Sequence, residues 1–340
     1  MPFADISKSQ ANTILGAIHF TEAGLDSALA YNDIPNLNLT AKVLQGHEMA
    51  SELLIVEDSA VVSGRHAHIQ YRSNAAYLFG VITLPEFADT VDVSGLQLST
   101  EQAYNEIFEL MAAFDYPYIY RFWNYVTDIN GVNKNLERYW QFNAGRKDAF
   151  TRHAVTIGEQ YPAACALGLS KGPLSIAFLL GRDTIPIAIE NPRQVSAYEY
   201  PEQYGPRTPS FSRATLLKSS DIATLFISGT ASIVGHETYH LNDPAAQTRE
   251  TMVNLQIVLN QANQQLDRPL FKLNELFLRV YVRNAHDLPL IKQAIHDHLN
   301  ATCKAIYILA EICRQDLLLE IEAIAQADMS QVNLTKADLS

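Results

Sequence analysis

Cysteine and positive charge are both scarce in this sequence. Its 340 residues include three cysteines, an odd number with no CxxC pair. Such a set builds no disulfide framework, so we expect a reducing compartment, the cytoplasm. The 25 lysines and arginines are outnumbered by 37 acidic residues, which gives a net charge of −12. Nucleic acids and anionic membranes are bound through basic surfaces, and we expect neither as a partner.

Long apolar runs are missing as well. The N-terminal stretch MPFADISKSQANTILGAIHF carries Asp5 early and has no apolar segment typical of a signal peptide. No run is long enough to span a bilayer, and neither a P-loop nor a G-x-G-x-x-G nucleotide fingerprint occurs. The chain is 48% hydrophobic and 18% charged, which is typical of a soluble globular protein with a large core.

Turn signals and hydrophobic periodicity divide the chain into two similar halves. After about 50 irregular residues, interpreted as an extended arm, each half shows strands, a helix, a strand, a second helix and two strands. We therefore predict an α/β (α+β) protein of two similar domains, each a mixed sheet with its helices on one face. The N-terminal domain with its arm is predicted to cover residues 1–185 and the C-terminal domain residues 190–330.

Helix starts are marked most clearly at two places. Ser99-Thr100-Glu101-Gln102 is typical of a capping box, and Asp243-Pro244 of an N-cap followed by proline at the first helical position. Further helices are predicted at 130–152 and 288–300. Strands are predicted at 52–56, 60–64, 74–83, 118–126, 163–168, 174–181, 195–200, 211–217, 222–228, 275–283, 304–310 and 317–324.

The run His236-Glu237-Thr238-Tyr239-His240 matches the zinc-protease signature H-E-x-x-H. That chemistry requires a helix, because the two histidines must project from one face one turn apart. Here the motif follows a strand and a turn of small residues, and the next helix is predicted only at Asp243. On a strand the two histidines would lie about 13 Å apart, too far for one zinc ion. We expect them to be hydrogen-bonding residues at a strand end or pocket rim.

The last predicted strand carries two glutamates on one face. Side chains alternate along 316–323, so Glu320 and Glu322 point the same way. They would form either a solvated acidic face or a site where one carboxyl faces a closed pocket. In a pocket, desolvation would raise its pKa and make it a general acid. Arg279 and Arg283 would line the same sheet or form surface salt bridges, and the pattern leaves both alternatives open.

Arginines and aromatic residues gather in the middle of the chain. The segment from Tyr120 to Tyr125 fits an aromatic core strand, and Arg138 and Arg146 lie on a predicted helix and its end. Arg213 stands in a stretch with few acidic residues. Because a guanidinium pairs bidentately with a carboxylate, we expect Arg213 to contact either a partner acid or an anionic ligand.

Taken together, these segments resemble the chorismatase family, whose members split chorismate into pyruvate and a cyclic acid. The resemblance spans both halves in order, while residues 1–100 carry little of it. The H-E-x-x-H run falls inside one of its blocks, and this family does not use zinc. The blocks are YRFWNYVTDIN (120–130), ERYWQFNAGR (137–146), ENPRQVSAYEYPEQYGPRTPSFSRA (190–214), SGTASIVGHETYH (228–240) and CRQDLLLEIE (313–322).

The resemblance implies a fold, a substrate and a set of site residues. The fold would be two fused domains similar to the trimeric chorismate-mutase-like fold, working as a monomer with no cofactor and no metal. The substrate would be chorismate, a small dianion that an acidic protein must hold with clustered arginines. Glu320 would be the catalytic acid that protonates the methylene of the enolpyruvyl ether. Substrate binding would involve Arg146, Arg213, Tyr200, Tyr198 and Tyr139.

Cys313 bears on the product. In the family, cysteine at this position resembles the branch that makes 3-hydroxybenzoate, where the hydrolytic branch has alanine, and some relatives of the first branch also release 4-hydroxybenzoate. Cys313 would otherwise be a small buried filler, as cysteine often is. Two alternatives stay open: a hydrolytic chorismatase giving a dihydroxycyclohexadiene carboxylate, and a non-catalytic protein that binds small anions on the same fold.

Overall fold

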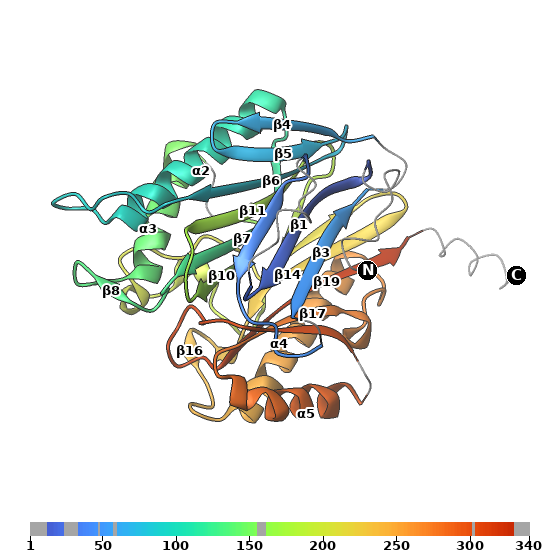
Figure 1. Cartoon of the computed structure of the whole chain (residues 1–340). Coiled ribbons are helices and arrows are strands. Elements are labelled where there is room, and N and C mark those ends of the chain that lie inside the picture. Colours follow the sequence, from blue (N-terminus) through green and yellow to red (C-terminus); the bar gives the residue numbers. More distant parts are fainter. Residues whose placement is uncertain are drawn as a thin grey trace, which may run out of the picture.

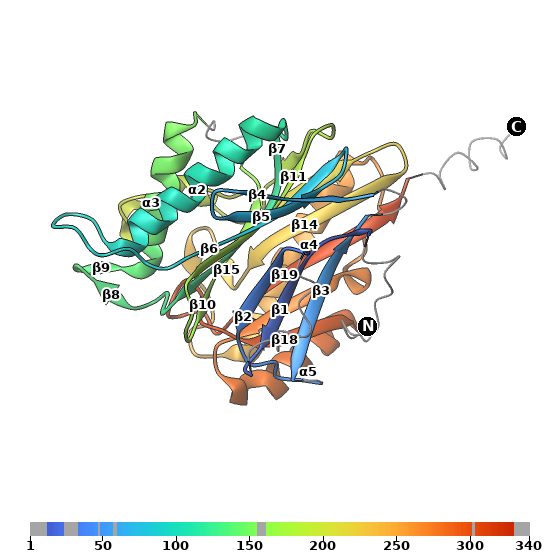
Figure 2. The same cartoon turned by 45° about the horizontal axis from the view of Figure 1, so that its top comes forward.

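The computed structural model describes residues 12–23, 33–46, 48–56, 60–154, 161–300 and 303–329. In these ranges the chain forms two six-stranded sheets, a three-stranded sheet and two short two-stranded ribbons. The pair α2 and α3 lies on one side of the sheets and α5 on the opposite side, with the N-terminal strands between (Figure 1; Figure 2). No helix in the described ranges is long and apolar enough to cross a membrane.

The first large sheet has the strand order β10-β7-β11-β6-β5-β4. Its strands β10 and β7 are parallel, and all other neighbours are antiparallel. The crossover helices α2 and α3 pack on one face. The elements are β4 (Val62–His66), β5 (Ile69–Ser73), β6 (Tyr77–Leu84), α2 (Gly95–Phe114), β7 (Tyr118–Thr127), α3 (Arg138–Arg152), β10 (Ala163–Leu169) and β11 (Leu174–Gly181).

The second large sheet repeats this topology with the order β18-β17-β19-β14-β13-β12. Its parallel pair is β17 with β18, and its crossover helices are α4 and α5. The predicted fold class, two similar halves with mixed sheets and helices on one face, is confirmed. The elements are β12 (Ile187–Ile189), β13 (Ala214–Lys218), β14 (Ile222–Thr230), α4 (Pro244–Gln265), β17 (Phe277–Val282), α5 (Leu288–Leu299), β18 (Lys304–Leu309) and β19 (Leu319–Asp328).

The helices bury apolar stripes against the sheets, and the inner sheet faces share one core. Residues of α2 and α3 pack with the first sheet, and residues of α4 and α5 pack with the second. On the inner side, Trp123 of β7, Phe226 of β14 and Tyr281 of β17 belong to the same buried cluster as Phe20 of the N-terminal strand β1 (Ile14–Thr21). Burial of this apolar surface is the main stabilising contribution to the fold.

The described part of the predicted N-terminal arm is a sheet, so the expectation of an irregular arm is wrong there. Strands β1 (Ile14–Thr21), β2 (Asn36–Thr40) and β3 (Met49–Ile55) form it in the order β2-β1-β3. All eight residues of β1 are buried. A strand that is buried on both faces does not alternate polar and apolar residues. The sequence of β1 therefore lacks the period of two by which a strand is normally recognised.

The predicted start of α2 is wrong by one turn. The helix begins at Gly95, and the Ser94 side chain accepts the cap hydrogen bond from the Gln97 N–H. The Ser99 hydroxyl instead accepts from the Phe87 N–H and donates to the Pro85 carbonyl, which fixes the preceding loop. For α4 the prediction is confirmed, because Asp243 caps the Ala246 N–H and Pro244 is the first helical residue.

Three further predictions are corrected. The expected strand at 195–200 is a 3-10 helix, η3 (Ala197–Glu199), and a second one follows at η4 (Glu202–Tyr204). The first part of 130–152 is a ribbon of β8 (Val132–Asn133) and β9 (Leu136–Glu137) rather than helix. β5 was not predicted as a separate strand. A turn of only two residues separates β4 from β5, too short to interrupt the hydrophobic pattern.

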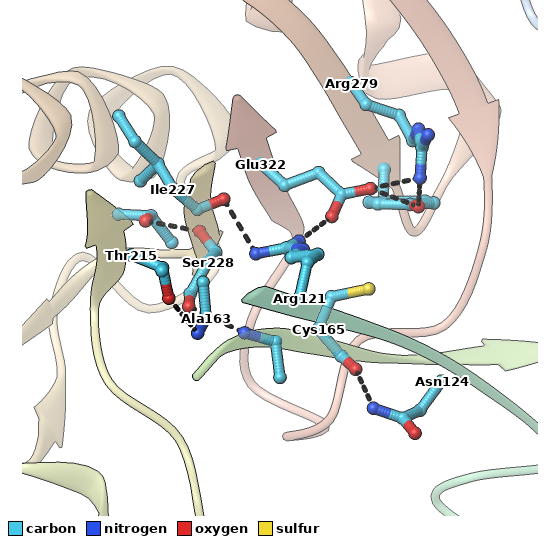
Figure 3. A network of polar contacts seen from close by, with 12 residues as sticks. Arg121, Asn124, Ala163, Cys165, Thr215, Ile227, Ser228, Arg279 and Glu322 are labelled. Carbon is cyan, nitrogen blue, oxygen red and sulfur yellow. Dashed lines mark hydrogen bonds and ion pairs between the residues drawn. The ribbon is translucent and has the colours of Figure 1, made fainter. Parts of the chain in front are cut away.

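The two halves meet where the edge strand β10 lies against β13 and β14. The Ala163 N–H donates to Thr215 Oγ1 at 2.7 Å, and the Ala164 N–H donates to Ser228 Oγ at 2.9 Å (Figure 3). Side-chain hydroxyls of the second half thus satisfy the open edge of the first sheet, where unpaired backbone groups would be costly.

Candidate active site

A cavity of about 340 Å³ lies at this junction. The first half contributes α3 and β10, and the second half contributes β14, β19 and the two segments 194–213 and 313–317. The volume is in the range of pockets that enclose small ligands. Six of the seven predicted site residues line it: Glu320, Cys313, Arg146, Arg213, Tyr200 and Tyr139.

Glu320 is the carboxyl at the centre of this site. It lies on β19, is 4% exposed and makes no ion pair with any described residue. Burial raises its pKa to about 8, assisted by the nearby negative charge of Glu322 and opposed by Arg121 and a hydrogen bond from Cys313. At neutral pH the group is therefore a protonated acid inside a cavity, which is the state that a general acid needs.

The Glu320 carboxyl lies against Gly229 of β14, and there is room for it only because glycine has no side chain. A Cβ at position 229 would lie 1.8 Å from Glu320 Oε1 and 2.5 Å from its Cδ. The pairing of β14 with β19 shifts between Ile227 and Thr230, so a bulge falls at this point of the strand. Bulges often occur next to active sites, where they redirect the backbone.

Cys313 and Tyr139 line the cavity around Glu320. Cys313 Sγ lies 3.9 Å from Glu320 Oε2. Burial and the neighbouring Glu320 raise the pKa of the Cys313 thiol to about 12, so it is a neutral, weakly polar neighbour. Burial likewise raises the pKa of Tyr139, and the effect of Cys313 adds to it. Cys313 and Tyr139 are therefore uncharged neighbours of the Glu320 carboxyl.

Arg146 of α3 presents unpaired donors. It is 2% exposed, and its Nε and Nη2 have no hydrogen-bond partner among the described residues. Its guanidinium lies over the rings of Tyr104, Phe122 and Phe150 at 5.2–5.5 Å. A buried guanidinium without an acid costs free energy unless an anion is bound, so this residue is prepared for an anionic ligand.

Arg213 precedes β13 and is oriented by its neighbours. Its Nη2 donates to the Val195 carbonyl at 2.7 Å and to the Tyr200 hydroxyl at 2.9 Å. Its Nε is 3.9 Å from Glu190 Oε2 and has no hydrogen-bond partner among the described residues. The sequence could not decide whether Arg213 contacts a partner acid or an anionic ligand. The structure shows a long ion pair with Glu190, while the Arg213 Nε donor remains without a hydrogen-bond partner among the described residues.

Arg314 is a third guanidinium in the wall, and the sequence analysis missed it. Its Nη1 donates to the His236 carbonyl at 2.8 Å, and its guanidinium stacks 4.0 Å from the centre of the Tyr204 ring. Its Nη2 is buried and unpaired within the described chain. A single arginine in a turn belongs to no periodic pattern that would mark it as a site residue. The sequence does show it directly after Cys313, and that position was a signal that could have identified it.

Tyr198 is the predicted site residue that does not line the cavity. It lies in η3 and packs against Tyr161 with ring centres 5.4 Å apart. Tyr200, two residues later, contacts Arg213 and lines the cavity. The segment was expected to be a strand, in which both tyrosines would share a face, but the 3-10 turn separates them.

Glu322 shares a strand face with Glu320 but has different surroundings. Arg121 and Arg279 form ion pairs with it, and the Tyr281 hydroxyl donates to it at 2.8 Å (Figure 3). Burial acts to raise the pKa of Glu322, but the two guanidinium groups outweigh burial and lower the pKa. The alternative of a solvated acidic face with surface salt bridges is therefore wrong, because these groups are buried.

The H-E-x-x-H run lies on a hairpin and not on a helix. The hairpin pairs β15 (Ile233–Val234), which precedes the run, with β16 (Glu237–Thr238), which lies inside it. His236 Nδ1 is 3.1 Å from the Tyr204 hydroxyl near the cavity, and His240 Nε2 is 3.6 Å from Glu250 Oε2. The expectation of hydrogen-bonding residues at a pocket rim is confirmed for His236. In the described ranges no group of three or more His, Cys, Asp or Glu could hold a metal ion.

Comparison with known proteins defines the class of enzyme. Residues 53–180 match the family model "Chorismatase FkbO/Hyg5-like, N-terminal". A "3-hydroxybenzoate synthase" of Streptomyces hygroscopicus is 34% identical over 79% of this chain and 79% of its own length. A "Chorismatase" of Streptomyces rapamycinicus is 35% identical over 77% and 78%. A chorismatase crystal structure superposes with a TM-score of 0.83 at 31% identity, covering 92% of this chain and 93% of the other.

The chain belongs to the chorismatase family, enzymes that act on chorismate. The resemblance identified from the five sequence blocks is confirmed.

Proposed function

We propose that this chorismatase converts chorismate to 3-hydroxybenzoate and pyruvate, with Glu320 as the catalytic acid. The observation that supports this is a protonated carboxyl, buried in a cavity whose walls hold unpaired guanidinium donors. An enol ether is cleaved once its methylene carbon accepts a proton, and a neutral acid in a desolvated site is suited to that transfer.

The reaction starts with proton transfer from the Glu320 carboxyl to the enolpyruvyl methylene. A C–H bond forms, the double-bond electrons supply it, and positive charge develops on the ether carbon as an oxocarbenium ion. The Glu320 carboxylate produced at that moment lies beside this cation and stabilises it. The bond between the ring carbon and the ether oxygen then breaks, and its electrons complete the carbonyl group of pyruvate, whose methyl group carries the transferred proton. The ring cation left behind is neutralised by its own hydroxyl oxygen, and loss of a ring proton to the Glu320 carboxylate makes the ring aromatic and restores the acid, so no water is consumed.

Three guanidinium groups support binding of the two substrate carboxylates. Arg146, Arg213 and Arg314 each have at least one buried donor with no partner among the described residues. Arg146 comes from the first half, and the other two come from the second half. Unpaired buried donors on arginines that line the cavity favour a dianion over a neutral ligand, since each gains a hydrogen bond only when an acceptor binds.

Which cyclic product forms depends on whether a water molecule is consumed in the reaction. Chorismate has the composition of 3-hydroxybenzoate plus pyruvate, so the aromatic branch consumes no water, whereas the dihydroxycyclohexadiene product requires one. Cys313 stands next to Glu320 where the resemblance places the cysteine of the aromatic branch. The name of the 3-hydroxybenzoate synthase relative supports the same product.

We also propose that the enzyme acts as a monomer in the cytoplasm. Both halves of this chain contribute to the wall of the cavity, and Cys165, Cys303 and Cys313 are all free thiols. The expected end of the first domain at 185 lies between β11, which ends at Gly181, and β12, which begins at Ile187, but the expected start of the second domain at 190 leaves out β12 (Ile187–Ile189). We propose that the second domain, 190–330 in the prediction, begins with β12, because this strand belongs to the second sheet.

Incubation with chorismate, followed by chromatography of the aromatic products and a pyruvate assay, tests the proposal. We expect 3-hydroxybenzoate and pyruvate in equal amounts. Glu320→Gln should abolish turnover, while His240→Ala should keep it. Arg213→Ala should mainly raise KM, by about tenfold or more, because it removes a binding donor. Full turnover by Glu320→Gln would overturn the assigned acid, and a dihydroxycyclohexadiene product would reassign the branch.

A further inference from the structure

The segment Ile312–Leu318, here called the arch, connects β18 to β19 and forms one wall of the cavity. It carries Cys313, which contacts Glu320, and Arg314, whose guanidinium stacks on Tyr204. The arch contains no regular secondary structure that would fix its backbone. One backbone hydrogen bond lies within it, from the Leu317 N–H to the Arg314 carbonyl at 3.2 Å, and the other contacts that fix its shape come from outside the segment.

One guanidinium makes three of the hydrogen bonds that hold the arch. Arg283, just after β17, donates from Nε to the Leu317 carbonyl at 2.7 Å. Its Nη2 donates to the carbonyls of Ile312 at 3.1 Å and Arg314 at 2.8 Å. A single planar fork thus binds three carbonyls along the arch, at both of its ends and beside Cys313. Arg283 itself is not part of the cavity wall.

Two amide side chains complete the support. Asn130, from the first half, accepts from Arg283 Nη1 at 3.1 Å and donates to the Ile312 carbonyl at 3.0 Å. Gln247 of α4 donates to the Asp316 carbonyl at 2.9 Å and accepts from the Leu318 N–H at 2.8 Å. The arch is therefore held from a strand and a helix of its own half and from a loop of the other half.

We propose that Arg283 is a positioning residue of this enzyme, which fixes the arch so that Cys313 and Arg314 face the cavity beside Glu320. It acts without touching the substrate. Its fork geometry is what matters, because a lysine keeps the charge but offers a single donor atom and cannot bind three separate carbonyls. The expected effect on KM rests on the proposed function. The expected effect on the position of the arch does not depend on turnover.

The chain contains a matched control for the test. Arg182 also donates to three backbone carbonyls, those of Ala75, Phe114 and Asp115. It lies after β11 and does not line the cavity. Arg283→Lys and Arg182→Lys therefore remove the same kind of clamp, one at the arch and one elsewhere. Asn130→Ala is the second variant at the arch, and it substitutes for Arg283→Lys if that protein does not fold.

Two measurements are made on the purified full chain. The first is the rate at which iodoacetamide alkylates Cys313, read by peptide mass spectrometry with Cys165 and Cys303 followed alongside. Burial suppresses the Cys313 thiolate in the wild type, so release of the arch should speed alkylation. Because Cys165 also lines the cavity, Cys303, which does not, is the reference for accessibility outside it. We expect an increase of about tenfold or more at Cys313 relative to Cys303 in Arg283→Lys and in Asn130→Ala, and none in Arg182→Lys. This readout needs no catalysis, so it stands even if the wild type does not consume chorismate.

The second measurement is KM for chorismate. Displacement of the Arg314 donor should raise KM about tenfold in Arg283→Lys and leave it unchanged in Arg182→Lys. Wild-type alkylation and wild-type KM in Arg283→Lys would overturn the inference. Equal changes in Arg182→Lys would also overturn it, because they would show a general loss of stability. Failure of the wild type to turn over chorismate would instead contradict the proposed function.

Discussion

At the scale of single residues, two glutamates on one strand face have opposite charge states. Glu320 has a thiol and a glycine backbone as neighbours, whereas two arginines contact Glu322. The pKa of the first is raised to about 8 and that of the second is lowered. The surroundings of each glutamate, and not its position along the strand, therefore make Glu320 the acid and Glu322 a structural anion. Catalytic pairs of carboxyls typically have pKa values separated in this way.

The raised pKa of Glu320 has a consequence for stability. Its ordinary pKa is 4.5, and in the folded chain it is about 8. Between these values the folded state keeps a proton that the unfolded chain releases, so stability falls as pH rises through this window. Glutamine has a similar shape and does not ionise. We expect Glu320→Gln to melt a few degrees above the wild type at pH 9, with a smaller difference at pH 4.

Thermal unfolding of both proteins over this pH range measures the effect. Other ionisable groups are common to both, so the difference isolates position 320. A difference that does not grow from pH 4 to pH 9 would mean that the Glu320 carboxyl ionises normally in the folded chain.

At the scale of elements, the bulge in β14 and the start of β19 form one unit that fixes the acid. The sequence predicted a strand over 317–324 and placed Glu320 on a distinct face, because period-two alternation is a strong local signal. It could not predict which face is closed, since Gly229 and Arg121 come from segments distant in the chain. The segment 195–200 was predicted as a strand because its aromatic residues imitate strand composition.

Gly229→Ala tests this unit. The new Cβ would collide with the Glu320 carboxyl, which must move away from the substrate. We expect kcat to fall about a hundredfold or more, since a displacement of about 1 Å has effects of that size. The control is Gly181→Ala, whose Cβ would collide equally closely with the Tyr120 ring, away from the cavity.

Gly181→Ala should lower the melting temperature and leave kcat near the wild-type value. A wild-type kcat in Gly229→Ala, or equal losses in both variants, would show that the space at Gly229 is not what positions the acid.

At the scale of the whole molecule, a chain of three buried charged residues and the half-buried Glu52 joins three sheets. Glu52 of the N-terminal sheet pairs with Arg279 of β17, which also pairs with Glu322 of β19, and Glu322 pairs with Arg121 of β7. The sequence predicted the repeat of the two halves because each half shows the same order of elements. It missed the N-terminal sheet, and it could not pair Glu52 with Arg279 across 227 positions.

Arg279→Met should be strongly destabilising, because it leaves the Glu322 and Glu52 carboxylates short of a partner. We expect a loss of about 3–5 kcal/mol in the free energy of unfolding, measured by urea denaturation. The control is Lys272→Met, which breaks an exposed pair with Glu275 and should cost less than about 1 kcal/mol. Similar losses in the two variants would contradict a structural role for the buried charges.

Infrared difference spectroscopy of the wild type against Glu320→Gln tests the central claim most directly. A protonated carboxyl has a carbonyl stretch that a carboxylate lacks. The account predicts such a band at pH 7 in the wild type, absent from Glu320→Gln and lost from the wild type as pH rises past about 8. No difference in that band between the two proteins at pH 7 would show that Glu320 is already ionised and cannot be the acid.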